Sequence, residues 1–177
     1  MLPFVSALTP CGYRRSGWRE GMEMIRTCRV TDLAGLLVLY GELRPDDPPL
    51  AADMAIATLE SLLNDPRIRL IVAEVDGQLA ATCQLGIVPT LTNEGRPFGI
   101  IEHVITAKRF RRRGLSQRVL EKALALAWEQ RCYKVMLLSG EGREAAHRLY
   151  EKLGFKAGIE RGFVIKRPQE NSVCPDV

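Results

Sequence analysis

A run of basic residues from Lys108 to Arg118 surrounds a single glycine, Gly114, at the beginning of a helix-like pattern. It holds six positive charges and no acid: Lys108, Arg109, Arg111, Arg112, Arg113 and Arg118. The first turn of a helix leaves backbone N–H groups unpaired and carries partial positive charge. A glycine turn before it lets those groups converge on a phosphate. The pattern predicts a phosphate-binding turn, and a solvated basic loop with an ordinary turn glycine is the alternative.

Positive charge is concentrated in this run. The chain has a net charge of +4, and six of its 25 Lys and Arg residues lie here. Outside the run, acidic residues outnumber basic ones, because the chain holds 21 Asp and Glu. Nucleic-acid-binding proteins usually spread positive charge over a whole face. The distribution therefore favours a compact polyanion, and a nucleic-acid binder that uses residues 108–118 is the less favoured alternative.

Two other side chains differ in chemistry from their surroundings. Glu102 is a carboxylate within the apolar stretch FGIIEHVI, where it either takes part in a reaction or marks a strand edge or an ion pair. Tyr150 lies at the border of an apolar helical stripe over residues 145–153, so its ring could serve packing alone.

Composition limits the remaining possibilities. The five cysteines are odd in number and scattered, which predicts reduced thiols and a cytoplasmic protein. With only two histidines, and no cysteine pair at metal-ligand spacing, no metal site is expected. No apolar run approaches the roughly 20 residues of a membrane helix. The first residues lack a basic segment before their apolar stretch, so no signal peptide is expected.

A length of 177 residues suits one domain. The sequence predicts a poorly structured extension over 1–23, a domain over 24–168 and a polar tail over 169–177. Periodicity and turn residues predict strands over 23–30, 68–75, 78–88, 98–106, 133–139 and 162–167, and helices over 31–43, 51–65, 115–129 and 143–155. This order predicts an α/β fold with a mixed, mostly antiparallel central sheet and flanking helices.

The stretch RRRGLS resembles the (Gln/Arg)-x-x-Gly-x-(Gly/Ala) signature of the GCN5-related N-acetyltransferase (GNAT) superfamily. Arg111 takes the first position, Gly114 the fourth and Ser116 the sixth. Serine departs from the usual Gly or Ala but is small, so binding should survive. IIEHVIT before the signature, CYKVMLLS after it and then AAHRLYEKLGF extend the resemblance over residues 24–167.

The resemblance implies that acetyl-CoA is the cosubstrate and lies between splayed parallel strands. Its pyrophosphate would bind the backbone amides of about residues 112–117, and its pantetheine would pair with the backbone of 104–106. An arginine of the run could bind the adenosine 3′-phosphate. The implied cosubstrate-binding residues are Val104, Ile105, Thr106, Arg111, Arg112, Arg113, Gly114, Leu115, Ser116 and Gln117.

Acetyl transfer to an amine requires removal of an amine proton, hydrogen-bond donors for the carbonyl oxygen and a proton for the leaving thiolate. The resemblance implies Glu102 as the general base, usually through water, the Ile105 N–H as the oxyanion donor and Tyr150 as the acid. A structural role remains the alternative for Glu102, as packing does for Tyr150.

The segment around Glu102 also resembles glucosamine-6-phosphate N-acetyltransferase, in which an acidic pair lies here. This chain has His103 in place of the second acid, which weakens transfer of that sugar substrate. Strand alternation would turn His103 away from Glu102 unless a β-bulge intervenes.

We therefore expect direct transfer from acetyl-CoA to a primary amine of a small molecule or peptide, within a ternary complex. A cysteine acyl-enzyme is disfavoured, because no cysteine lies beside a base in the motif region. Glu42, Asp46 and Asp47 could attract a cationic amine, or be solvated loop charges. A catalytically silent acyl-CoA-binding regulatory domain is the main alternative. Dimers are common in the family, which leaves a homodimer open.

Overall fold

The computed structural model describes residues 22–167, so the predictions for residues 1–21 and for the polar tail lie outside the described residues. The elements are β1 (Glu23–Thr27), α1 (Leu33–Leu43), α2 (Ala52–Asn64), β2 (Ile68–Val75), β3 (Gln78–Val88), β4 (Phe98–Thr106), α3 (Leu115–Glu129), β5 (Val135–Leu137) and α4 (Glu144–Lys152). Short 3₁₀ turns occupy Val30–Asp32, Asn93–Gly95 and Lys108–Phe110. None of the helices within this range is long and apolar enough to span a bilayer.

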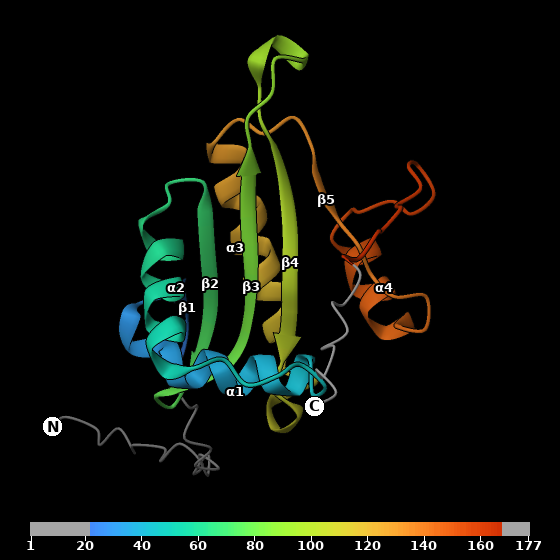
Figure 1. Ribbon diagram of the computed structural model, residues 1–177. Coiled ribbons are helices and arrows are strands. Elements are labelled where there is room, and N and C mark those ends of the chain that lie inside the picture. The colour runs from blue at the N-terminus through green and yellow to red at the C-terminus, as the bar shows by residue number, and fades with distance from the viewer. Residues whose placement is uncertain (1–21, 168–177) are drawn as a thin grey trace, which may run out of the picture.

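The strands form one sheet in the order β1-β2-β3-β4-β5 (Figure 1). Neighbours from β1 to β4 are antiparallel, and β5 joins β4 in parallel. This arrangement confirms the predicted mixed, mostly antiparallel sheet. The pairing of β4 with β5 covers only Gly99–Ile101 and Val135–Leu137. Beyond Ile101, β4 and β5 are no longer paired.

The two faces of the sheet are covered by different helices. α3 packs on one face, where Leu115, Val119 and Leu120 are at most 1% exposed, together with Cys83 and Leu85 of β3. α1 and α2 cover the other face (Figure 1). The amphipathic stripe of α3 explains this, because burying each large apolar side chain stabilises the fold by about 1.5–3 kcal/mol.

A β-bulge interrupts the pairing of β3 with β4. One residue of β3, Cys83, faces two residues of β4, His103 and Val104. His103 adopts a left-handed backbone with a φ of 55°. An inserted residue shifts the alternation of side chains between the two faces. The alternation that would turn His103 away from Glu102 therefore does not hold.

The strand predicted over 162–167 is wrong, because these residues form no strand. Phe163, Val164 and Ile165 are 86%, 72% and 97% exposed. Strand propensity reflects packing on a pleated, half-buried surface. No such surface covers these side chains within residues 22–167. The strand predicted over 133–139 is also shorter than expected, since only Val135–Leu137 pair.

A buried ion-pair cluster fixes the start of α1 to the sheet. Arg26 of β1 donates to Asp32 at 2.6 Å and to Glu74 of β2 at 2.6 Å. Asp32 is the N-cap of α1, which begins two residues later than the helix predicted over 31–43. Its carboxylate, however, accepts the Arg29 N–H at 2.7 Å and makes no side-chain bond to α1. Asp32 is 8% exposed, and the cluster thereby sets where α1 crosses the sheet.

We expect Asp32→Asn to destabilise the protein by about 3 kcal/mol at neutral pH, because Arg26 loses a buried charged partner. Burial alone would raise the pKa of Asp32, but the Arg26 guanidinium and the Arg29 N–H hold that pKa below its ordinary 3.8. A depressed pKa contributes stability that is present above the ordinary value and lost as the pH falls below it. The difference between wild type and variant, measured by urea unfolding, should therefore shrink below about pH 4.

Asp65→Asn is the control, because Asp65 pairs with Arg67 at 3.0 Å where the Arg67 side chain is 61% exposed. It should change stability far less. Equal losses in the two variants at neutral pH would contradict a special role for Asp32.

Candidate active site

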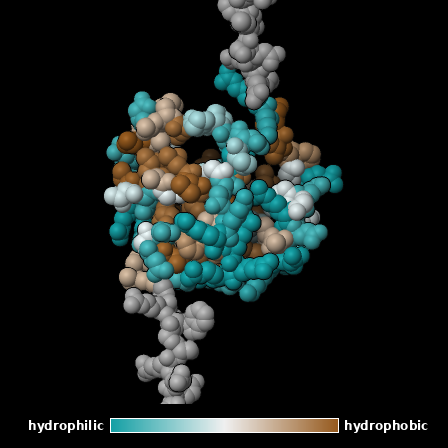
Figure 2. Space-filling model, turned by 90° about the horizontal axis from the view of Figure 1, so that it is seen from below, coloured by the Kyte–Doolittle hydropathy of each residue, from teal (hydrophilic) through white to brown (hydrophobic). Residues whose placement is uncertain are grey.

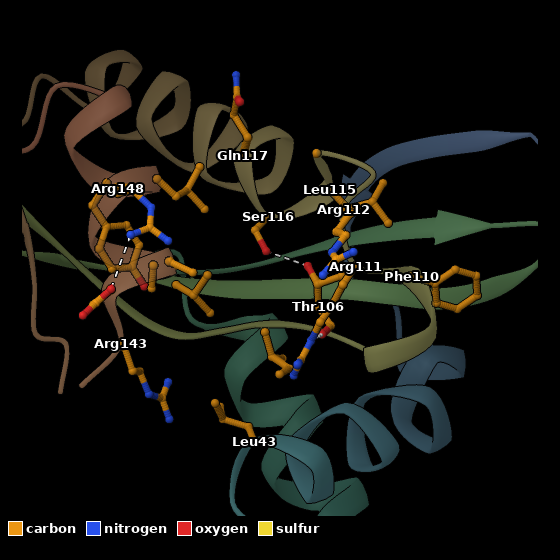
Figure 3. Close-up of a pocket in the computed structure, with 18 of the residues that line it drawn as sticks. Leu43, Thr106, Phe110, Arg111, Arg112, Leu115, Ser116, Gln117, Arg143 and Arg148 are labelled. Carbon is orange, nitrogen blue, oxygen red and sulfur yellow. Dashed lines mark hydrogen bonds and ion pairs between the residues drawn. The ribbon is translucent and has the colours of Figure 1, made fainter. Parts of the chain in front are cut away.

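A cleft of about 940 Å³ opens where β4 and β5 part (Figure 3). Its walls come from the end of β4, the turn before α3, the first turn of α3 and most of α4. Glu42 and Leu43, in the last turn of α1, close it on the other side. The cleft therefore borders both α3 and α1, which lie on opposite faces of the sheet. Figure 2 views the molecule from below, the side on which α1 lies in Figure 1, and shows this surface hollowed.

The predicted phosphate-binding turn lies in the wall of the cleft. Gly114 has a φ of 73° and is the N-cap of α3. The Arg118 N–H donates to the Gly114 carbonyl at 3.1 Å, which begins the helical hydrogen bonding. The N–H groups of Leu115, Ser116 and Gln117 precede that bond, so they are the ones that a helix leaves unpaired. All three residues line the cleft, as a binding site for a phosphate requires.

The serine that departs from the family signature has a defined place. The hydroxyls of Ser116 and Thr106 share a hydrogen bond of 2.6 Å, which joins the first turn of α3 to the end of β4 (Figure 3). A Gly or Ala at this position could not make that bond. The serine hydroxyl therefore has a hydrogen-bond partner within the wall of the cleft.

The arginines of the basic run do not all lie in the cleft. Arg111 and Arg112 line it, and the Arg111 Nε donates to the Thr106 carbonyl at 3.4 Å. Arg113 does not line it, although it was predicted with the others. The Arg113 guanidinium instead pairs with Glu23 of β1. A contact between residues 90 positions apart cannot be read from a local motif.

The opposite wall contains residues that the sequence reasoning missed. Arg143 and Arg148 bring positive charge from the start of α4, and Arg148 pairs with Glu144 at 3.5 Å. Figure 3 shows the Arg143 side chain extending away from Ser116, toward the level of Leu43. Gly140 and Gly142 precede α4 much as Gly114 precedes α3, and this second glycine turn was the available signal.

Tyr150 of α4 lines the cleft and packs edge-to-face on Phe155, with 6.1 Å between ring centroids. Burial raises the pKa of its phenol above 10, the nearby Arg143 charge opposes this, and the Glu102 charge adds to it. The phenol therefore keeps its proton at neutral pH. A protonated phenol in the wall of a cleft can donate that proton to a leaving group.

Glu102 and Ile105 lie at different places. Ile105 lines the cleft, and its side chain packs on Leu39 of α1. Glu102 pairs with Gln84 across the strands and is half-buried, but it does not line the cleft. The structure thus brings Ile105 and Tyr150 to the phosphate-binding turn, and places Glu102 beside the bulge.

A family model described as the acetyltransferase (GNAT) family matches residues 36–155, which include β4, the phosphate-binding turn and all of α4. The chain belongs to the GNAT family. Family membership confirms the predicted class of reaction, transfer of an acetyl group to an amine, with acetyl-CoA as the family's cosubstrate.

Relatives agree with this assignment. A glucosamine 6-phosphate N-acetyltransferase of Trypanosoma brucei brucei is 29% identical over 135 residues, which cover 75% of this chain and 88% of the relative. The structure of a putative acetyltransferase from Agrobacterium tumefaciens str. C58 matches with a TM-score of 0.77 and 40% identity, over 81% of this chain and 99% of that one. The aminoglycoside N-acetyltransferase AAC(6′)-Iy, solved in complex with CoA, matches with a TM-score of 0.71 and 20% identity, over 84% and 97%.

The site of this GNAT protein fits acetyl-CoA in shape and charge. A Cβ added at Gly114 would meet no atom within 4 Å, so the turn is open toward an approaching phosphate. Two arginines line the same wall. Within residues 22–167, no group of His, Cys, Asp or Glu could hold a metal ion. Burial raises the pKa of the Cys83 thiol to about 12, so this thiol is a poor nucleophile.

We expect Gly114→Val to weaken acetyl-CoA binding by at least roughly tenfold, or about 1.4 kcal/mol. The added side chain would occupy the open space beside the N–H groups, and a left-handed backbone would strain any residue with a Cβ. Isothermal titration calorimetry with acetyl-CoA measures the affinity.

Gly77→Val is the matched control, since Gly77 in the β2–β3 hairpin has a φ of 76° and equally open space. It should lose similar stability while acetyl-CoA affinity stays unchanged. An unchanged affinity in Gly114→Val would remove the turn from the site.

Proposed function

We propose that this GNAT protein transfers the acetyl group of acetyl-CoA directly to a primary amine of a small molecule or peptide, within a ternary complex in the cleft. One observation carries the proposal: the separation of β4 from β5 brings the Gly114 turn, the β4 backbone at Val104 and Ile105, and the Tyr150 phenol to one cleft. These are the parts that acetyl transfer needs on its cosubstrate side.

On the cosubstrate side, the pyrophosphate of acetyl-CoA binds the N–H groups at the start of α3, and Arg111 and Arg112 add positive charge. The pantetheine lies along Val104–Thr106, where β4 has lost its β5 partner. Backbone groups freed by that separation are the natural partners for an amide-containing chain. An arginine of the basic run binds the adenosine 3′-phosphate.

On the acceptor side, the amine nitrogen attacks the acetyl carbonyl carbon, so a C–N bond forms and the C–S bond breaks. The amine proton leaves toward the Glu102 carboxylate, directly or through water. The Ile105 N–H stabilises the negative charge that develops on the carbonyl oxygen. Tyr150 donates its proton to the thiolate as the intermediate collapses.

Of the acidic residues in the α1–α2 region, only Glu42 takes part in this proposal. Glu42 lines the cleft and accepts the Lys108 N–H at 2.9 Å. It can therefore attract a cationic amine while holding the start of the basic run. Asp46 and Asp47 are exposed and lie outside the lining of the cleft, so we assign them solvated loop charge.

Two general properties belong to the same proposal. We propose a reducing, cytoplasmic location, supported by the free thiols of Cys28, Cys83 and Cys132. We also propose a homodimer. Two observations support a homodimer. The apolar side chains of residues 163–165 are exposed, and the preceding Gly162 lies close to Leu138, which directly follows the edge strand β5.

The test is an amine panel in which free CoA thiol is followed with a chromogenic disulfide. The panel contains glucosamine 6-phosphate, an aminoglycoside and a peptide with a free amino terminus. Turnover of at least one amine supports the proposal. Acetyl-CoA binding without turnover of any amine would favour the silent binding domain. Tight binding of duplex DNA without acetyl-CoA binding would favour the nucleic-acid reading.

We expect Tyr150→Phe to lower turnover by at least roughly tenfold, since loss of a general acid costs about 10²–10⁴ in rate. Acetyl-CoA affinity should stay within a few-fold of wild type, because the ring remains and only the hydroxyl is lost. Melting temperature should hardly change for the same reason. Steady-state kinetics and thermal unfolding together check these values.

Tyr133→Phe is the matched control, because Tyr133 packs edge-to-face on Phe98 at 6.3 Å, outside the lining of the cleft. Its turnover should equal that of wild type. Full activity in Tyr150→Phe would overturn the acid assignment. A large loss of stability without a specific rate effect would show that Tyr150 serves packing.

A further inference from the structure

The β-bulge in β4 reverses the face on which the following side chains lie. Ile101 and Val104 both pack in the cluster under α3, although strict alternation would put residues three apart on opposite faces. Ile105 packs on Leu39 under α1. The two residues between Ile101 and Val104 are Glu102 and His103, so the bulge adds one side chain to the α1 face.

Independent contacts also place Glu102 and His103 on the α1 face of the sheet. Glu102 pairs with Gln84, whose neighbours Cys83 and Leu85 lie in the cluster under α3, so Glu102 faces α1. The His103 ring meets the ring of Tyr40, a residue of α1, edge-to-face at 5.6 Å between centroids. Both side chains are half-buried. An imidazole and a carboxylate from consecutive residues therefore share one face of the sheet.

This face borders the side of the cleft that the proposed function assigns to the acceptor, although Glu102 and His103 do not themselves line the cleft. The phosphate-binding turn approaches the cleft from α3, and Glu42 and Leu43 of α1 close its other side. Val104 and Ile105, which line the cleft, follow His103 directly in β4. An amine on the α1 side would therefore attack next to the bulge.

The backbone of His103 also favours a functional role. A left-handed φ is uncommon outside glycine, and strained residues of this kind cluster at active sites. Imidazoles are the side chains that most readily exchange a proton at neutral pH.

We propose that His103 accepts the proton that the acceptor amine loses, and that Glu102 stabilises the imidazolium so formed. The proton moves from the amine nitrogen to an imidazole nitrogen as the C–N bond forms, and it passes to solvent after the product leaves. The inference rests on the proposed function and refines it: His103 takes the proton directly from the amine, and Glu102 acts through His103 by balancing its positive charge.

The titratable groups around His103 suit this role. Burial raises the pKa of Tyr40 to about 12, and the Tyr150 phenol across the cleft also stays protonated. Glu102 shares the α1 face of the sheet with His103, while Glu42 of α1 and Arg143 before α4 line the neighbouring cleft.

His103→Asn tests the proposal with little risk to the fold, because Asn tolerates a left-handed backbone. With the panel amine that wild type acetylates fastest, kcat/KM should fall at least roughly tenfold and the acid limb of its pH profile should flatten. Acetyl-CoA affinity should not change. His147→Asn is the control, because His147 lies on α4, where its ring shares a hydrogen bond of 3.0 Å with the Gly140 carbonyl, and this variant should leave the profile unchanged.

Glu102→Gln and the double variant show whether the pair acts as one unit. The double variant should be little slower than His103→Asn, because groups that act together are strongly non-additive. A wild-type profile in His103→Asn, with the loss confined to Glu102→Gln, would overturn the inference and leave the proposed function standing. Failure of wild type on every amine would instead contradict the proposed function.

Discussion

The short parallel pairing of β4 with β5 is the constraint on which the site depends. Three residues of each strand pair, Gly99–Ile101 with Val135–Leu137, and then the strands part. Pairing farther along β4 would occupy backbone groups at Val104–Thr106 and close the cleft. Because it stops at Ile101, α3 and α4 can present their first turns to a common space, and a polyanionic cosubstrate can lie between them.

The β-bulge at His103 places neighbouring residues of β4 on different faces of the sheet. It keeps Val104 under α3 while turning His103 toward α1, and the proposed function assigns these two faces to the cosubstrate and the acceptor. The Arg26 cluster fixes the start of α1, whose last turn closes the acceptor side. The ion pairs of Arg26 thus contribute to the shape of the cleft, because they fix the position of α1.

Local sequence signals predicted the parts of the site that are local in structure. The basic run around a glycine before an amphipathic helix, together with the family signature, predicted the turn at Gly114, and the periodicity and turn residues predicted the sheet. Contacts between distant residues could not be predicted in this way: Arg113 pairs with Glu23, and Ser116 bonds Thr106. The bulge escaped prediction because nothing in FGIIEHVI requires an inserted residue. The segment over 162–167 has strand propensity but lacks a covering surface, which propensity alone cannot reveal.

The central claim is that the gap between β4 and β5 holds the reacting end of the cosubstrate. A crystal structure of the protein with bound CoA tests it most directly. We predict the pyrophosphate on the backbone N–H groups of residues 112–117 and the CoA sulfur in hydrogen-bond contact with the Tyr150 hydroxyl. A CoA molecule bound elsewhere, or a sulfur atom directed away from Tyr150 and the β4 backbone at Ile105, would contradict the account.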